Sequence, residues 1–248
     1  MANGEGFAPT IGYLRRFAVN RPGQPEVIRQ RLYDHLLYPT AGSTQLNFFQ
    51  TPVGQGITTA LGATAAASKS EADTNMRLAG QLPALLNFVM QSIEVTFDPG
   101  SVSTANTYTP VKQGIGAGVA DAAAAQALLE KGNDPETFYR SGFLKLTIGS
   151  KDYLLEAPLG AFPPKTQTIV DAALAESTGT AALAFGNALT LVKTNRAGRP
   201  YLVQPNISLM SNQNFVVSLN WPGVVATPSG FNARVGVILD GFTYRASQ

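Results

Sequence analysis

The sequence predicts an all-β protein built as an antiparallel sandwich, and three observations carry this prediction. The first is the alternation of apolar and polar residues, sharpest in the run that holds Phe215, Val217, Leu219 and Trp221 on one face. The second is that such runs are spread along all 248 residues. The third is that Pro- and Gly-rich turns separate them, which is typical of antiparallel sheets.

Four alternating runs are expected to direct one face into a common core. They are Ile93, Val95 and Phe97 in 92–97; Leu144, Leu146 and Ile148 in 144–148; the run 215–221; and Val235, Val237 and Leu239 in 235–239. A fifth, weaker run contains Leu189 and Leu191. The apolar phase of the last run switches near Gly241, which predicts a β-bulge.

The N-terminal region is predicted to be a basic helical arm. Pro25 suits a first helical position, Ile28, Leu32 and Leu36 follow helical spacing, and Pro39 ends the helix. We therefore divide the chain into an N-terminal basic helical arm, 1–40, and a β-sandwich domain, 41–248.

The other elements follow from the same turn and periodicity signals. In chain order they are a strand at 45–49, a strand pair between 76 and 97, an Ala-rich helix at 119–131, a hairpin of 143–148 and 153–157, a short helix or ordered loop at 168–176, and strands at 189–193, 201–204, 214–221 and 233–244. The total of eight or nine strands is near the eight of a jelly roll, so a single jelly roll with short helices in loops is favoured and a compact double jelly roll is the alternative.

Composition indicates a chain that buries neutral surface against copies of itself. Charged residues make up 14% of the sequence, whereas a soluble domain usually carries about a quarter. The segments 54–70 and 101–120 are rich in Gly, Ala and Thr, and we expect them to be contact loops that become ordered only in an assembly. The net charge of +2 is too small to identify a nucleic-acid binder.

Several function classes are excluded or disfavoured. The chain has no Cys, so disulfides and thiolate sites are impossible, and His35 is its only histidine, so one chain cannot build a multi-histidine metal site. No G-x-S-x-G motif is present, and the glycines at 114–118 do not follow G-x-G-x-x-G. We predict no enzyme activity, no cofactor and no metal. No signal peptide or membrane-spanning run is seen, so a cytosolic site of synthesis is expected.

Three segments resemble a known family. They are Leu46-Asn47-Phe48-Phe49-Gln50-Thr51-Pro52-Val53-Gly54, Gly80-Gln81-Leu82-Pro83 and Gly236-Val237-Ile238-Leu239-Asp240-Gly241-Phe242-Thr243-Tyr244-Arg245. With the basic arm and the Cys-free sandwich, the chain resembles a jelly-roll major capsid protein of a small tailless icosahedral bacteriophage. The resemblance implies a virion protein, assembled in the host bacterial cytoplasm into trimers or pseudo-hexameric capsomers. It also implies other virion proteins such as pentons as partners, and a shell around the genome, in some members over an internal lipid membrane.

The basic arm is the predicted functional site. Its arginines are expected to contact packaged nucleic acid or anionic lipid through sequence-independent contacts to phosphate. They are Arg15, Arg16, Arg21, Arg29 and Arg31. The alternative is structural: the helix packs under a sandwich, and the arginines pair with carboxylates such as Asp34.

Two other functions remain open on sequence alone. A carbohydrate- or receptor-binding sandwich would expose Tyr108, Tyr139 or Trp221 in a groove, although the phase of Trp221 favours the core. A hydrolase would bring together two carboxylates across one cleft. The candidates for such a pair are Glu71, Asp73, Glu94 and Glu156.

Overall fold

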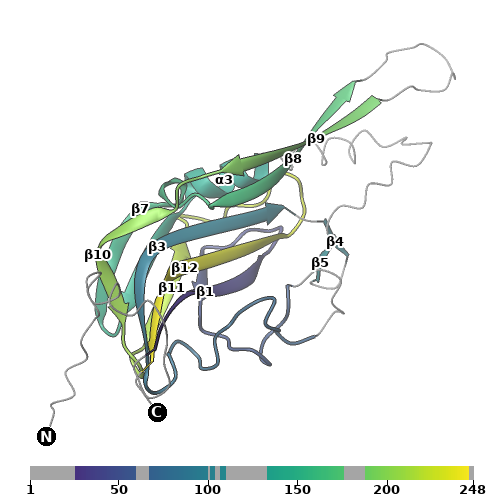
Figure 1. Ribbon diagram of the computed structural model, residues 1–248. Helices are drawn as coiled ribbons and strands as arrows, with labels where there is room; N and C mark the ends of the chain where they lie inside the picture. The colour runs from purple at the N-terminus through teal and green to yellow at the C-terminus, as the bar shows by residue number, and fades with distance from the viewer. Residues whose placement is uncertain are drawn as a thin grey trace, which may run out of the picture.

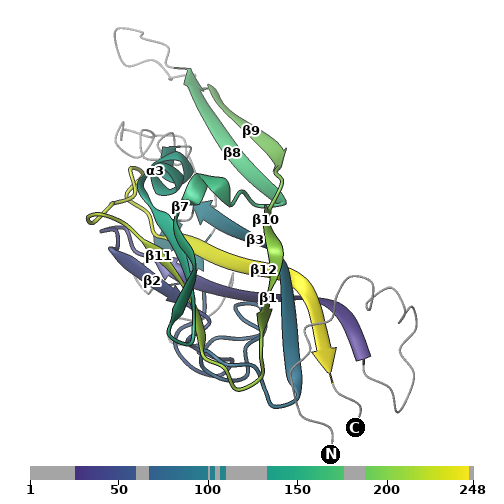
Figure 2. The same cartoon turned by 90° about the vertical axis from the view of Figure 1, so that its left-hand side faces the viewer.

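The computed structural model describes residues 26–59, 67–99, 101–103, 107–109, 133–175 and 188–245. These residues are mostly β-strand, and the main strands form two four-stranded antiparallel sheets that face each other (Figure 1, Figure 2). The predicted all-β class is confirmed, as is its antiparallel character. No helix in the described ranges has both the length and the apolar character needed to span a bilayer.

The first sheet has the longer strands of the two. Its strands, in spatial order, are β1 (Glu26–Tyr38), β12 (Ala233–Arg245), β3 (Leu86–Pro99) and β10 (Tyr201–Leu209). The second sheet contains β2 (Gln45–Phe48), β11 (Phe215–Asn220), β6 (Phe143–Ile148) and β7 (Lys151–Pro158), again in spatial order.

Two hairpins and two short helices complete the described elements. The hairpins are β4 (Ser101–Ser103) with β5 (Thr107–Thr109), and β8 (Thr166–Ala175) with β9 (Ala188–Ala197). The helices are α3 (Asn133–Ser141) and a 3-10 turn, η1 (Leu159–Ala161). In both ribbon views the β8–β9 hairpin projects beyond the sandwich (Figure 1, Figure 2).

The core lies between the sheets, on the faces predicted from the alternation. Every apolar residue assigned to the core in the four runs is at most 4% exposed. The register explains this burial: Val217 lies between Phe48 and Leu146 in one sheet, and Val237 pairs with Val95 in the other. Because alternate side chains point to one face, correct pairing directs all four runs inward together.

The predicted bulge at Gly241 is confirmed. The pairing of β12 with β3 shifts register between Asp240 and Gly241. A Cβ atom at Gly241 would lie 2.1 Å from the carbonyl oxygen of Val89, so only glycine allows this close approach of two backbones.

The predicted helix over 25–38 is wrong, because residues 26–38 form β1, a full member of the first sheet. Two tertiary effects hide its strand period. Asp34 occupies a core-facing position and is fully buried, which interrupts the apolar alternation between Leu32 and Leu36. On the opposite face, Tyr33 and His35 are partly covered by a segment from the β2–β3 connection, so both faces carry ring-bearing or apolar residues.

Other expectations also change or fall outside the described residues. Residues 168–175 form most of β8 instead of a short helix, because they pair with β9. Only one strand, β3, lies between 76 and 97, where a pair was expected; residues 78–82 make isolated bridges. The 143–148 hairpin is confirmed. The expected helix at 119–131 and residues 1–25 lie outside the described residues.

Candidate functional site

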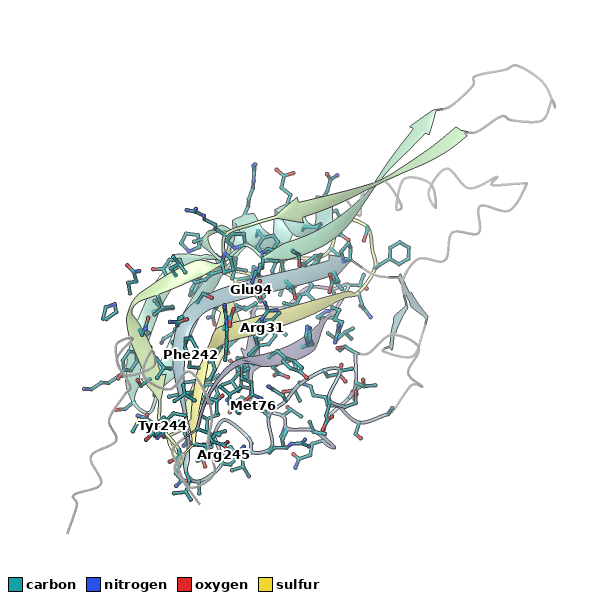
Figure 3. The ribbon with its side chains drawn as sticks, in the orientation of Figure 1. Arg31, Met76, Glu94, Phe242, Tyr244 and Arg245 are labelled. Carbon is teal, nitrogen blue, oxygen red and sulfur yellow. The ribbon has the colours of Figure 1, made fainter. Side chains whose placement is uncertain are left out.

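Two of the five predicted site residues lie on the face of the first sheet that points away from the core. Leu32 is buried in the core, so strand alternation places Arg29 and Arg31 on the opposite face of β1. Figure 3 shows Arg31 close to Glu94, which belongs to β3 of the same sheet. Arg15, Arg16 and Arg21 lie outside the described residues.

Both arginines pair with carboxylates that are more deeply buried than they are. Arg29 binds Asp240 through two nitrogens, Nη2 to Oδ2 at 2.9 Å and Nε to Oδ1 at 3.3 Å. Arg31 lies 3.9 Å from both Glu94 Oε1 and Asp240 Oδ2. The arginine side chains are 64% and 46% exposed, whereas those of Asp240 and Glu94 are 11% and 4% exposed. Each arginine therefore neutralises a buried acid and still presents part of its guanidinium to solvent.

Glu94 also links the sheet to the chain that follows β7. Its Oε2 accepts a hydrogen bond from the backbone N–H of Lys165 at 2.5 Å. The backbone N–H of Val95 donates to the carbonyl oxygen of Phe162 at 3.0 Å. These two bonds hold the 159–165 connection beside β3, where β10 no longer pairs.

An open groove of about 660 Å³ lies over this part of the sheet. Its lining residues come from β1, β12 and the β2–β3 connection: Arg29, Gln30, Arg31, Tyr33, Ile238, Glu71, Asn75 and Arg77. Arg77 is the residue that sequence reasoning missed, and it lies far from the other two arginines in the chain. Three guanidinium groups in one groove suit a phosphate or carboxylate, because the planar fork of arginine matches such oxygens.

Charge in the groove is partly compensated. Arg77 pairs with Glu71 at 2.6 Å, and both side chains are exposed, at 61% and 68%. An anion that enters the groove would therefore have to displace the carboxylates that already pair with these arginines. Exposed pairs of this kind contribute little stability, so the displacement costs little at Arg77 and more at Arg29, whose acid is buried.

One wall of the groove is formed by residues 67–76, which we call the clasp. The clasp runs along the edge of β1: the N–H of His35 donates to Asp73 O at 2.8 Å, and Tyr33 N donates to Asn75 Oδ1 at 3.1 Å. Asn75 Nδ2 in turn donates to Arg31 O at 2.7 Å. The clasp thus satisfies backbone groups that an edge strand would otherwise leave unpaired.

Asp73 organises the clasp. Its carboxylate accepts hydrogen bonds from the hydroxyl of Thr58 at 2.5 Å, from the N–H and hydroxyl of Thr59 at 2.8 Å each, and from Ser70 N at 3.1 Å. Burial raises the pKa of Asp73, but these hydrogen bonds outweigh burial and the pKa is lowered. Arg234 Nη2 lies 3.7 Å away.

This network corrects the expectation for the 54–70 loop. Thr58 and Thr59 are each 2% exposed and are held within a single chain, so this flank of the loop does not need an assembly to become ordered. Residues 60–66 lie outside the described residues, as does most of 101–120.

A buried ion pair fastens the clasp to the sandwich. Lys69 Nζ lies 2.6 Å from Asp34 Oδ1, and the two side chains are 2% and 0% exposed. Asp34 Oδ2 also accepts the backbone N–H of Phe49 at 2.7 Å. Burial raises the pKa of Asp34, and Lys69 opposes that rise. The structural alternative expected the arginines to pair with carboxylates such as Asp34. Arg29 and Arg31 do pair with carboxylates, but with Asp240 and Glu94, whereas Asp34 pairs with Lys69.

His35, on β1, lies beneath the clasp. Its Nδ1 lies 2.9 Å from Asp73 O, and since a carbonyl only accepts, Nδ1 carries the proton. Burial, reinforced by the charge of Arg234, lowers the pKa of His35 from 6.5 to about 4.

The lowered pKa of His35 predicts acid sensitivity. Between pH 6.5 and 4 the unfolded chain binds a proton at His35 and the folded chain does not. The contribution of His35 to the free energy of unfolding is therefore fully present above pH 6.5, and the free energy of unfolding falls by up to about 3 kcal/mol as the pH approaches 4. Urea unfolding of the wild type and His35→Gln at several pH values measures this. The variant, which has no histidine, should lose clearly less stability over that interval; equal losses in both would contradict the assignment.

Several residues named for the other two functions have other contacts in the described part of the chain. Asp73 is consumed by the clasp, and Glu94 is held by Arg31 and Lys165. The described residues contain no group of three His, Asp or Glu side chains placed to hold a metal ion. Trp221 is 4% exposed, as predicted for a core residue, and the hydroxyl of Tyr139 donates to Val95 O at 2.7 Å. The side chains of Tyr108 and Glu156 lie outside the described set.

Comparisons with protein-family models, with curated proteins and with solved structures found no match to this chain.

Proposed function

We propose that this chain is a coat protein with a single jelly-roll fold, which assembles with copies of itself into the icosahedral shell of a small tailless bacteriophage. The strand order of the two sheets supports the jelly-roll part of the proposal, and the sparsely charged surface supports the coat function. The strand order concerns the eight strands that remain when the β4–β5 and β8–β9 hairpins are set aside.

Numbered one to eight along the chain, these strands pair first with eighth, second with seventh, third with sixth and fourth with fifth. The pairs are β1–β12, β2–β11, β3–β10 and β6–β7, all antiparallel. A long antiparallel hairpin wrapped into two sheets has this pairing, and it is the arrangement expected of a jelly roll, an architecture used by viral capsid domains and also by lectins and cupins. The fold alone therefore does not select a function.

The surface favours a coat over the other jelly-roll functions. Several large apolar residues from separate segments are exposed, among them Leu85 before β3 at 61%, Leu202 in β10 at 64% and Val224 after β11 at 65%. With only 14% charged residues, the chain has much neutral surface that contacts between copies in a closed shell would bury. Trp221, the residue best suited to stack on a sugar ring, is buried, and this disfavours the lectin alternative.

We further propose that the N-terminal end of β1 faces the packaged nucleic acid or an internal lipid membrane. Glu26 pairs with Arg245, so residues 1–25 connect to the sheet at this corner, a few residues from Arg29 and Arg31. Five arginines thus come from one short stretch of chain, and a shell would repeat them in every copy, so that weak phosphate contacts act together.

Electron microscopy and size-exclusion chromatography of the purified full chain test the coat function. Shells or trimeric capsomers that convert to shells are the expected result. A monomer that forms no particle at any salt or protein concentration would defeat the proposal.

The same particles test the role of the arginines. Arg15→Gln, Arg16→Gln and Arg21→Gln together should lower the nucleic-acid or lipid content and reduce the salt slope of binding by about 0.7–0.9 per lost phosphate contact, while shells still form. Arg29→Gln with Arg31→Gln should in addition destabilise the fold, since Asp240 and Glu94 lose their partners. Normal packaging by both variants would assign all five arginines a structural role only.

A further inference from the structure

The β8–β9 hairpin, which we call the ribbon, projects beyond the sandwich in both views (Figure 1, Figure 2). Its strands pair with each other over all ten residues, from Thr166 with Ala197 to Ala175 with Ala188. Neither strand pairs with any other strand in the described part of the chain. An isolated two-stranded ribbon is at best marginally stable in water, so we expect a further strand or surface to stabilise this one.

The edges of the sandwich are each protected against pairing with another chain. The clasp covers the edge of β1 from Arg31 to His35, and β2 is only four residues long. The pairing of β7 with β6 is interrupted by register shifts, and β10 contains Pro205 within an interruption of its pairing with β3. Short edges, bulges, prolines and covering loops are the usual devices by which proteins prevent edge-to-edge association.

Within the residues that the structure describes, the two ribbon strands show none of these devices. Its ten register pairs run without a shift, and neither strand contains proline. Its twenty strand residues include three charged ones, Asp171, Lys193 and Arg196. In a two-stranded antiparallel ribbon, alternate N–H and C=O groups of each strand point away from the partner strand. A long, regular and sparsely charged edge of this kind is a template for an added strand.

We propose that the ribbon pairs edge to edge with the ribbon of a second copy of this chain, forming a four-stranded antiparallel sheet across a two-fold contact. We choose a second copy of the chain as the partner because every copy presents the same ribbon edge, whereas the edges of the sandwich are protected. A strand that pairs antiparallel with its own copy generates a closed, isologous two-fold interface. The inference rests on the proposed self-assembly and names the contact through which copies join.

A deletion with a matched control tests the ribbon. Replacing 168–195 by Asn-Gly leaves the base intact, where Thr166 pairs with Ala197 and Gly198 N donates to Lys165 O at 3.2 Å, and closes it with a two-residue turn. The control replaces only 176–187 by Asn-Gly, which keeps both strands. We expect the control to associate like the wild type and the ribbonless variant to lose the two-fold contact in light scattering, with the same melting temperature. Wild-type association of a folded ribbonless variant would overturn the inference.

Hydrogen exchange of the wild type gives a test that does not depend on a deletion variant. In the dissociated protein, alternate amides of each ribbon strand should exchange rapidly. In the assembled protein, consecutive amides of the strand at the contact should be protected, because the added strand binds the outward N–H groups. Alternating protection that persists in assembled material would also overturn the inference.

The outcomes separate this inference from the coat function. Ribbon-dependent dimers without shells would support the ribbon contact and overturn the coat proposal. Shells from both the wild type and the ribbonless variant would support the coat function and overturn the ribbon contact. A wild type that stays monomeric would overturn both.

Discussion

Lys69→Met is expected to lower the free energy of unfolding by about 3–5 kcal/mol, because it leaves the carboxylate of Asp34 buried without its counter-ion. Asp34 is 0% exposed and pairs with Lys69 in the described part of the chain, so its charge has no route to water unless the clasp opens. The pKa of Asp34, already raised by burial, should rise further in the variant. Urea unfolding at neutral pH measures the loss.

The matched control is the double variant Lys69→Met with Asp34→Asn. Asparagine removes the charge and keeps a side-chain oxygen for the N–H of Phe49, so most of the lost stability should return. A double-mutant cycle with Asp34→Asn alone then gives the coupling free energy between the two side chains. A single variant Lys69→Met as stable as the wild type would show that the clasp is not fastened by this ion pair.

Leu219→Asp is expected to abolish folding. Leu219 is 0% exposed, pairs with Leu46 on one side and Leu144 on the other, and lies in the middle of the core. An ionised carboxylate placed there would be buried without a partner at a cost of several kcal/mol, which is a large part of the total stability of a domain. Soluble yield and the cooperativity of thermal unfolding are the measurements.

Val216→Asp is the matched control, since it makes an equally large change in polarity on the same strand. Val216 is only partly buried and lies on the face opposite to Leu219 in phase, so its carboxylate keeps access to water. We expect this variant to fold with a loss of about 1 kcal/mol. If both variants behaved alike, the assignment of the two faces of β11 would be wrong.

The core was predictable because it depends on a local pattern. In 215–221 and 235–239 every second residue is apolar without a break, and a strand with one apolar face has one way to bury it. Gly241 was predictable for the same reason, because the phase of the pattern changes there. The arginines at 29 and 31 could be recognised as a charged group, but not as members of a strand.

The parts that failed depend on contacts between residues distant in the sequence. In the sequence, Asp34 interrupts the apolar alternation of β1. In the structure, Lys69 of the clasp neutralises its charge, so Asp34 can occupy a buried position. Arg77 joins Arg29 and Arg31 in one groove only because the clasp returns to the edge of β1. Residues 168–175 carry no strong strand period and become a strand through pairing with β9.

The sequence by itself therefore determined the all-β class, the core faces and the glycine bulge, because side-chain alternation and backbone crowding are local properties. Only the tertiary structure decided that β1 is a strand, that the clasp protects its edge, and that the two ribbon strands, among the described residues, pair only with each other. These features depend on which segments meet, and that choice is made by hydrogen bonds and ion pairs between segments that no local period encodes.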